Sequence, residues 1–400
     1  MNLINFRQIL KNKYFIPILI GIIIAVAGIV IGISKRGEKI TGEEGQKKIT
    51  EVELGSKKSF KSLLFGGGEY NLTYADMDPS LVENISLFES GENWQGDGFL
   101  DWRTFYEGKN SIGVASNDHQ PGIIFLEKNL DLSNLKILEF FISLNDVQSV
   151  ESITVKFGDL SLTNYYSYPL SNLREGWNFI RIPQEQFVAY KANPEFSWKD
   201  IKKIQFEVLS RPNTTLIANF DYLTAQKNTD YLNKWKVVDD KFLSLGKQDD
   251  TIALLARNEG ALQAILAEAG GENFSLQTSF IPKTIGEIGL FFRGNYANNR
   301  GYYLLAGGIN SSSCKLKKLG AKGWEELAVT NIVNFIFEKD QKYWLRVETK
   351  GQKITGFLST DGKNFTELVS VNDDEFTGGG VGIAVFGRGY GFFDDFKFRQ

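Results

Sequence analysis

The chain has 400 residues, more than one hydrophobic core usually holds, and its formal net charge at pH 7 is −3. This near-neutral charge excludes a nucleic-acid partner bound through a basic surface. The only cysteine, Cys314, excludes an intramolecular disulfide, and the only histidine, His119, excludes metal sites built on histidine pairs. The 40 glycines and the 13% of aromatic residues are typical of strands joined by tight turns.

An unbroken apolar run, Phe15–Ile33, contains no charged residue and is long enough to cross a bilayer as a helix. It predicts a transmembrane anchor at 15–34 after a cytoplasmic tail at 1–14, with the long remainder on the extracytoplasmic, cell-surface side. A cleaved signal peptide is the competing interpretation, because Ala25-Val26-Ala27 has the form of a cleavage site. The continuation of the run to Ile33 favours the uncleaved anchor.

Small residues recur on one face of this predicted helix, at Gly21, Ala25, Gly28 and Gly32. Such a face lets two membrane helices approach closely and would support self-association. Glycine and alanine are also simply frequent in membrane helices, so the face alone does not decide between the two interpretations.

Residues 35–80 are predicted to form a tether, because 35–60 are charged, contain glycine and are short of aromatic residues. Later in this range, Tyr70, Leu72 and Tyr74 alternate as in a short strand. Short alternating segments bounded by Gly, Asn, Asp and Pro then follow at 81–226 and again at 227–400. This pattern predicts an all-β chain, with two antiparallel β-sandwich (jelly-roll) domains behind the single N-terminal helix. Asp361-Gly362 and Lys350-Gly351 indicate hairpins. Thr251–Glu268 has helical spacing, but Gly260 interrupts it, and we predict two strands there.

The second block resembles the concanavalin A-like (laminin G-like) sandwich. The resemblance lies in the segments WKVVDD from Trp235, GYYL from Gly301, WLRV from Trp344, GFLSTDG from Gly356, and GVGI with FDDF near the C-terminus. It implies a fold but little about function, because this fold includes lectins, hydrolases and adhesive modules.

The first block resembles, more loosely, the galactose-binding-like jelly rolls that include many carbohydrate-binding modules. The resemblance lies in GWNFIRIP from Gly176, IKKIQF from Ile201 and ANFDYL from Ala218. In that family a structural calcium often lies between an early acidic residue and a late aspartate, which here implies Glu89 and Asp221. The alternative is that both are ordinary acids at strand ends. No other cofactor is expected.

Sugar binding requires an exposed aromatic plane and amide or carboxylate partners for hydroxyl groups. The loop-like segments TNYYSYP and ENWQGDGFLDW of the first block therefore provide candidates, and so does RGNYANNR of the second. Trp177 and Trp344 lie in clear alternating strands, and we assign them to the cores. The candidate ligand-binding residues are Trp94, Trp102, Asn164, Tyr165, Tyr166, Tyr168, Arg293, Asn295, Tyr296 and Asn299.

Catalysis is disfavoured by the sequence. Glycoside hydrolysis by the usual route needs two carboxylates that flank the scissile bond, and the one-strand E-x-D-x-x-E pattern of concanavalin A-like hydrolases is missing. We therefore expect a membrane-anchored cell-envelope protein that displays two sandwiches for non-catalytic binding of a glycan or envelope polymer, including adhesion. The alternative is a structural component of a surface layer or filament that binds protein neighbours, and a divergent glycoside hydrolase is a third.

Overall fold

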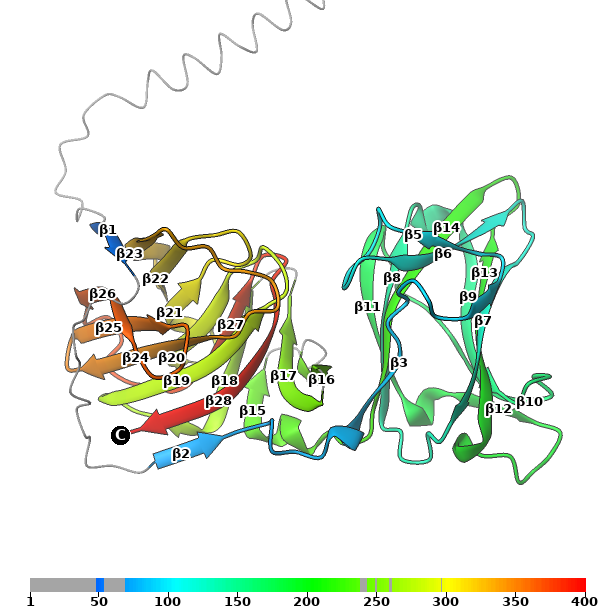
Figure 1. The fold of residues 1–400 in the computed structure, drawn as a ribbon, viewed down its shortest axis with the longest axis horizontal. Helices are drawn as coiled ribbons and strands as arrows, with labels where there is room; N and C mark the ends of the chain where they lie inside the picture. Colours follow the sequence, from blue (N-terminus) through cyan, green and yellow to red (C-terminus); the bar gives the residue numbers. More distant parts are fainter. Residues whose placement is uncertain (1–47, 54–68, 238–242, 249, 259–260, 296) are drawn as a thin grey trace, which may run out of the picture. The chain divides into compact units, whose positions relative to one another are not determined.

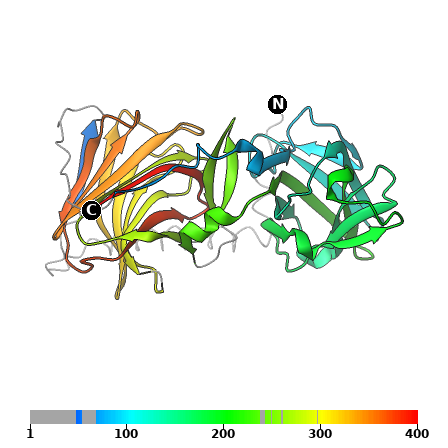
Figure 2. The ribbon, with the colours of Figure 1, turned by 90° about the horizontal axis from the view of Figure 1, so that it is seen from below.

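The computed structural model describes residues 48–53, 69–237, 243–248, 250–258, 261–295 and 297–400. Its four β-sheets form two sandwiches, which Figure 1 shows and Figure 2 gives from a second direction. We call strands β3–β14 the first sandwich, and β1, β2 and β15–β28 the second sandwich. The predicted all-β, antiparallel sandwich architecture is confirmed for the described residues.

One sheet of the first sandwich, the β13 sheet, has the strand order β12-β10-β9-β13-β7-β4. Its strands are β4 (Trp94–Gly96), β7 (Gly122–Leu130), β9 (Val150–Gly158), β10 (Asn164–Pro169), β12 (Val188–Lys191) and β13 (Ile201–Ser210). The other, the β14 sheet, has the order β11-β8-β14-β6-β5, and β3 also pairs with β14. Its strands are β3 (Val82–Ser86), β5 (Gly98–Asp101), β6 (Ser111–Asn117), β8 (Ile137–Leu144), β11 (Gly176–Pro183) and β14 (Thr215–Gln226).

The second sandwich also has two sheets. The first has the order β1-β23-β22-β21-β20-β27-β18-β15, with β1 (Lys48–Glu53), β15 (Trp235–Val237), β18 (Ala261–Gly270), β20 (Ile288–Asn295), β21 (Arg300–Ala306), β22 (Ser313–Gly320), β23 (Gly323–Val333) and β27 (Gly380–Phe386). The second has the order β16-β17-β28-β19-β24-β25-β26, and β2 pairs with β28. Its strands are β2 (Glu69–Leu72), β16 (Leu243–Gln248), β17 (Thr251–Arg257), β19 (Phe274–Pro282), β24 (Tyr343–Lys350), β25 (Lys353–Ser359), β26 (Thr366–Asn372) and β28 (Tyr390–Arg399).

The predicted tether at 35–80 is wrong for two segments, because both are strands of the second sandwich. β1 pairs with β23 in parallel, from Lys48 opposite Ala328 to Glu53 opposite Val333. β2 pairs with β28, and the Arg399 guanidinium bonds the Glu69 carboxylate across this pair. The alternation of Tyr70 and Leu72 does lie in a strand, β2, whereas β1 has no local turn signal that links it to so distant a partner.

Local sequence explains the turns between paired strands. Asp361 lies between β25 and β26, and its carboxylate accepts hydrogen bonds from the backbone N–H groups of Lys363 and Asn364, so the predicted hairpin is confirmed. β24 and β25 also pair, as Lys350-Gly351 predicts. Thr251–Glu268 contains β17 and most of β18 rather than a helix.

Short 3₁₀ turns are the helical elements of the described chain, at Pro79–Leu81, Val147–Ser149, Gln184–Gln186, Trp198–Asp200 and Asp230–Lys234. None of the helices in the described residues has the length and apolar character needed to cross a membrane. The predicted anchor at 15–34 and its small-residue face lie outside those residues.

Candidate functional site

The β14 strand is buried on both of its faces. Phe220 and Ala218 point into the core of the first sandwich, as expected, but the outward-facing Asn219 and Asp221 are buried as well. An outer sheet face is normally solvated in an antiparallel sandwich. Here it is covered by the segment after β5 and by side chains of β17 and β28, which contribute to an aromatic cluster with Phe141 and Tyr222.

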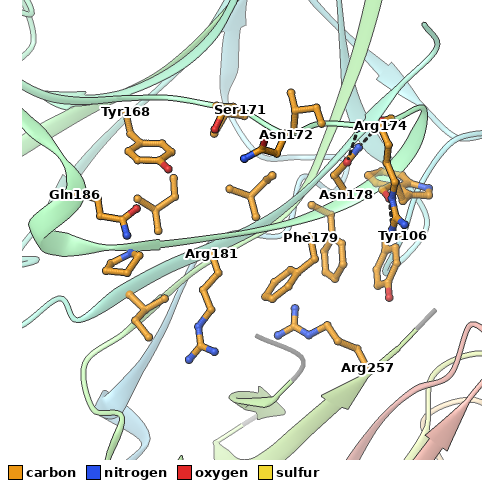
Figure 3. Close-up of a pocket in the computed structure, with 18 of the residues that line it drawn as sticks. Tyr106, Tyr168, Ser171, Asn172, Arg174, Asn178, Phe179, Arg181, Gln186 and Arg257 are labelled. Carbon is orange, nitrogen blue, oxygen red and sulfur yellow. Dashed lines mark hydrogen bonds between the residues drawn. The ribbon is translucent and has the colours of Figure 1, made fainter. Parts of the chain in front are cut away.

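A cleft of about 860 Å³ opens along β11, at the margin of this covered face. Cavities of 300–1,000 Å³ are typical of sites for small ligands. Its wall combines β11, the segment that follows β10, and the end of β17. The aromatic and polar lining residues are Tyr106, Phe141, Tyr168, Ser171, Asn172, Arg174, Trp177, Asn178, Phe179, Arg181, Gln186, Thr229, Arg257 and Asn258 (Figure 3).

Aromatic rings form part of the cleft wall. Tyr106 stacks on Phe141, with ring centroids 3.6 Å apart, and Trp177 meets Tyr106 edge to face at 5.8 Å. Trp177 and Tyr168 are only partly buried, so each presents some ring surface to the cleft. Because the rings are fixed by their neighbours, a ligand that stacks on them pays little side-chain entropy.

Amide side chains in the cleft differ in whether they already have partners. Asn178 is buried, and its amide donates to the carbonyls of Arg174 and Gly176 and accepts from the Arg174 N–H, so it shapes the turn before β11. Asn172 and Gln186 are exposed and have no side-chain hydrogen bond within the described part of the chain. These two amides are therefore available to a ligand.

Two arginines of the cleft wall, from different sandwiches, meet at one buried carboxylate, Glu139. Arg181 Nε lies 3.3 Å from Glu139 Oε1, and Arg257 Nη2 lies 3.5 Å from Glu139 Oε2. Figure 3 shows the side chains of Arg181 and Arg257 reaching from their strands toward the same part of the cleft. We call these three residues the arginine cluster. No Asp or Glu occurs among the described residues that line the cleft itself.

The two acids implied for calcium, Glu89 and Asp221, hold the same segment of chain. Asp221 Oδ2 accepts hydrogen bonds from the N–H groups of Tyr106 and Glu107, and Glu89 accepts from Lys109 N and Asn110 Nδ2. The described residues contain no cluster of three or more acidic, His or Cys side chains suited to a metal.

Asp221 nevertheless has a buried oxygen, Oδ1, without a hydrogen-bond partner, and burial raises the pKa of this carboxyl to about 8. A buried carboxylate in this state takes up either a proton or a cation. Asp221 Oδ1 could serve as a calcium ligand, with Glu89 as the second acid, and such an ion would serve the fold rather than any chemistry.

The predicted tyrosine platform is wrong in part, because the segment is a strand and its side chains alternate. Tyr166 points into the core, is 7% exposed and stacks on Trp198 at 4.1 Å, so it cannot contact a ligand. Tyr165 lies on the opposite face and stacks on Tyr190. The side-chain amide of Asn164 donates to the Asp159 carboxylate and accepts from the N–H of Asn193, so it already has hydrogen-bond partners. Tyr168 alone lines the cleft.

The two predicted tryptophans have different environments. Trp94 stacks on Phe88 at 4.7 Å and donates its indole N–H to Ser86 Oγ, so it packs against the core rather than presenting a free plane. Trp102 is 65% exposed, with the Arg103 guanidinium 4.7 Å from its ring centroid. It is not part of the cleft lining.

The predicted rim of the second sandwich is wrong for Arg293, which is 1% exposed and bonded to backbone carbonyls. Asn295 is exposed and caps the N–H of Ala297, and Asn299 lies in a left-handed turn with a φ of 56°. Tyr296 lies outside the described residues. The described residues of this loop do not line the cleft along β11.

The residues that the sequence interpretation missed are Tyr106, Trp177, Arg181 and Arg257. Trp177 was assigned to the core, but it lies on the outer face of β11 with Phe179 and Arg181, whereas Asn178, Ile180 and Ile182 face the core side. An arginine that alternates with two aromatic residues was the available signal, because a charged residue rarely lies on a core face.

No protein-family model matches the sequence, and no curated protein matches it. Solved structures do resemble it. The carbohydrate-binding module CBM66 of Bacillus subtilis matches with 18% identity and a TM-score of 0.35, over 41% of this chain and 94% of the module.

A family 11 carbohydrate-binding module of Clostridium thermocellum, in complex with a β-1,3-1,4-mixed-linked tetrasaccharide, has 15% identity and a TM-score of 0.26, over 40% and 96% of the two chains. The GH43 protein BlXynB of Bacillus licheniformis has 12% identity and a TM-score of 0.31, over 78% and 66%. At such identities and TM-scores these matches assign neither a family nor a ligand.

Proposed function

We propose that the chain binds a glycan in the cleft along β11, without chemical conversion of it. The observation that carries this proposal is the composition of the wall, where partly exposed rings of Trp177 and Tyr168 accompany the unpartnered amides of Asn172 and Gln186. A sugar presents an apolar ring face and a rim of hydroxyl groups, which these two kinds of side chain complement.

The absence of acids from the described cleft lining supports binding rather than hydrolysis. The usual glycosidase mechanism needs a carboxylic acid and a carboxylate on opposite sides of the bond. Glu139 is 1% exposed and engaged with two arginines, so it is not positioned as a proton donor to a sugar.

Presentation at the cell surface is part of the proposal and rests on the sequence. The apolar run Phe15–Ile33 supports an anchor with both sandwiches outside the cytoplasm. Protease added to intact cells stripped of their wall should remove the sandwiches from an anchored chain. An N-terminus that begins after Ala27 in the mature protein would show a cleaved signal peptide instead.

A glycan array with the full chain, purified in detergent, tests the binding proposal. Polysaccharide binding by the wild type should weaken by about tenfold or more in Trp177→Ala, because a stacking residue is lost. Trp324→Ala is the matched control, since Trp324 is about half exposed on the second sandwich and lies outside the cleft. Unchanged binding in Trp177→Ala would place any glycan elsewhere, and no bound glycan would refute the proposal.

One observation favours assembly with a protein neighbour as a second candidate function. Phe99, Leu100, Trp102 and Phe105 are each more than one third exposed, and they lie on or beside the edge strand β5. Exposed apolar side chains grouped at a sheet edge are typical of contact surfaces. If this patch joins copies of the chain, Trp102→Ala with Leu100→Ala should lower the sedimentation coefficient, and an unchanged value would refute self-assembly through it.

A further inference from the structure

Arg257 is held rigidly at the wall of the cleft. Its Nη2 atom donates to Ser244 Oγ and approaches Glu139, and its guanidinium lies 3.7 Å from the ring centroid of Phe179. The residue is 1% exposed. A guanidinium fixed in this way loses little conformational entropy when it binds a further group.

Two nitrogen atoms of Arg257 have no hydrogen-bond partner among the described residues. Arg257 Nε and Nη1 are buried and make no hydrogen bond within the described residues. Leaving a charged donor unpaired in a protein interior is costly, so this arrangement is unexpected for a purely structural arginine. The side chain lines the cleft and is directed into it (Figure 3), where an acceptor from a ligand would satisfy these donors.

A single buried carboxylate, Glu139, lies between the guanidinium groups of Arg181 and Arg257, and Gln226 Nε2 also donates to it. Among the described residues, Arg257 therefore has no carboxylate of its own.

We propose that the glycan bound in this cleft is anionic, with a carboxylate or sulfate that binds where Arg181 and Arg257 meet. The inference rests on the proposed function and specifies its ligand class. Arginine forks pair with planar or tetrahedral oxyanions through charge-assisted hydrogen bonds, which are stronger than those between neutral groups. A neutral sugar would stack on the same rings but would offer the two unpaired donors of Arg257 no charged acceptor.

Affinity electrophoresis of the wild-type chain against matched polysaccharides tests the inference. Polygalacturonate and alginate are each compared with their carboxyl-reduced forms, and dextran sulfate is compared with dextran. We expect at least one anionic polymer to bind about tenfold or more tightly than its neutral counterpart, the gain of a charge-assisted pair. Preference for the first two polymers assigns a carboxylate, and preference for dextran sulfate assigns a sulfate.

Equal binding of charged and neutral forms would overturn the inference and leave the proposed function standing. Failure of every polymer to bind would overturn both. In variants, Arg257→Met should lower the affinity for the anionic polymer by about tenfold or more, and Arg257→Lys, which keeps the charge but not the fork, by less. Arg388→Met is the control, because Arg388 is exposed and lies outside the cleft. Loss of the preference in this control as well would contradict a role for the arginine cluster.

Discussion

Arg257 and Arg293 are equally buried, each 1% exposed, yet their surroundings differ. Arg293, in β20, donates from Nε and Nη2 to the carbonyl of Glu272, from Nη1 to that of Phe376, and from Nη2 to that of Gly351. Arg257, in β17, leaves Nε and Nη1 unbonded within the described residues and shares its carboxylate with Arg181.

The number of hydrogen-bond partners distinguishes Arg293, which stabilises the fold, from Arg257, which can still bind a ligand. Arg293 joins three backbone segments of the second sandwich, and every one of its nitrogen atoms is used. Arg257 lies in the wall of a cleft with part of its hydrogen-bonding capacity unused. Burial alone therefore does not identify a functional arginine, whereas the count of partners does.

The largest effect on stability is expected at the fully bonded arginine. Arg293→Met removes four hydrogen bonds from a buried guanidinium to three backbone carbonyls and should lower the free energy of unfolding by about 3–5 kcal/mol. Urea unfolding followed by tryptophan fluorescence measures this loss. A change below about 1 kcal/mol would mean that these hydrogen bonds do not stabilise the fold. Arg293 would then not be a structural arginine.

Asp221, like Arg257, is a buried ionisable group with an atom that has no hydrogen-bond partner among the described residues. Burial raises its pKa to about 8 in the folded state, from an ordinary value of 3.8. The folded chain therefore keeps a proton that the unfolded chain releases, so stability from this group is present below pH 4 and is lost as the pH rises toward 8.

Asp221→Asn should remove that contribution to the pH dependence, on the order of 5 kcal/mol between pH 4 and 8. The measurement is urea unfolding of both proteins across this range in the presence of a chelator. Parallel curves for the wild type and the variant would show that Asp221 has an ordinary pKa.

Binding of a calcium ion, instead of a proton, is the other way in which the unpartnered oxygen Asp221 Oδ1 could be stabilised. If the ion binds Asp221 and Glu89, it should stabilise the wild-type chain by about 2.7 kcal/mol at a calcium concentration 100 times the Kd. Asp221→Asn should reduce this gain strongly, because it removes the charged ligand. A melting temperature that does not respond to millimolar calcium would exclude the site.

The smallest effect on stability is expected at Arg257. Arg257→Met keeps an apolar contact with Phe179, and Glu139 still has Arg181 as its partner. The free energy of unfolding should therefore change by about 1 kcal/mol or less. Thermal unfolding in parallel with Arg293→Met checks this. A loss as large as that of Arg293→Met would make Arg257 a structural arginine and remove the basis of the inference.

The fold class followed from the sequence because it depends on local signals. Alternating residues and turn residues such as Asp361-Gly362 indicate strands and hairpins wherever they occur. β2 shows the alternation of Tyr70 and Leu72, but nothing local indicated that β1 and β2 belong to the second sandwich, because their partners β23 and β28 lie hundreds of residues away.

The cleft was less predictable because it depends on which face of a sheet is covered. The burial of Tyr166 and the outward position of Trp177 both depend on the register of their strands, and a shift of one residue exchanges the two faces. Arg257 lies 76 residues from Arg181 in sequence, so no spacing rule relates them. The one local signal, Arg181 beside two aromatic residues on β11, indicated that this face of the strand is not core.

A crystal structure of the chain with a bound oligosaccharide of the preferred anionic polymer tests the central claim most directly. We expect a sugar ring against Trp177 or Tyr168, with its carboxylate or sulfate within hydrogen-bond distance, about 2.7–2.9 Å, of the guanidinium of Arg181 or Arg257. An oligosaccharide bound at Trp102 or at the stacked Tyr165 and Tyr190, with the arginine cluster unchanged, would contradict the account.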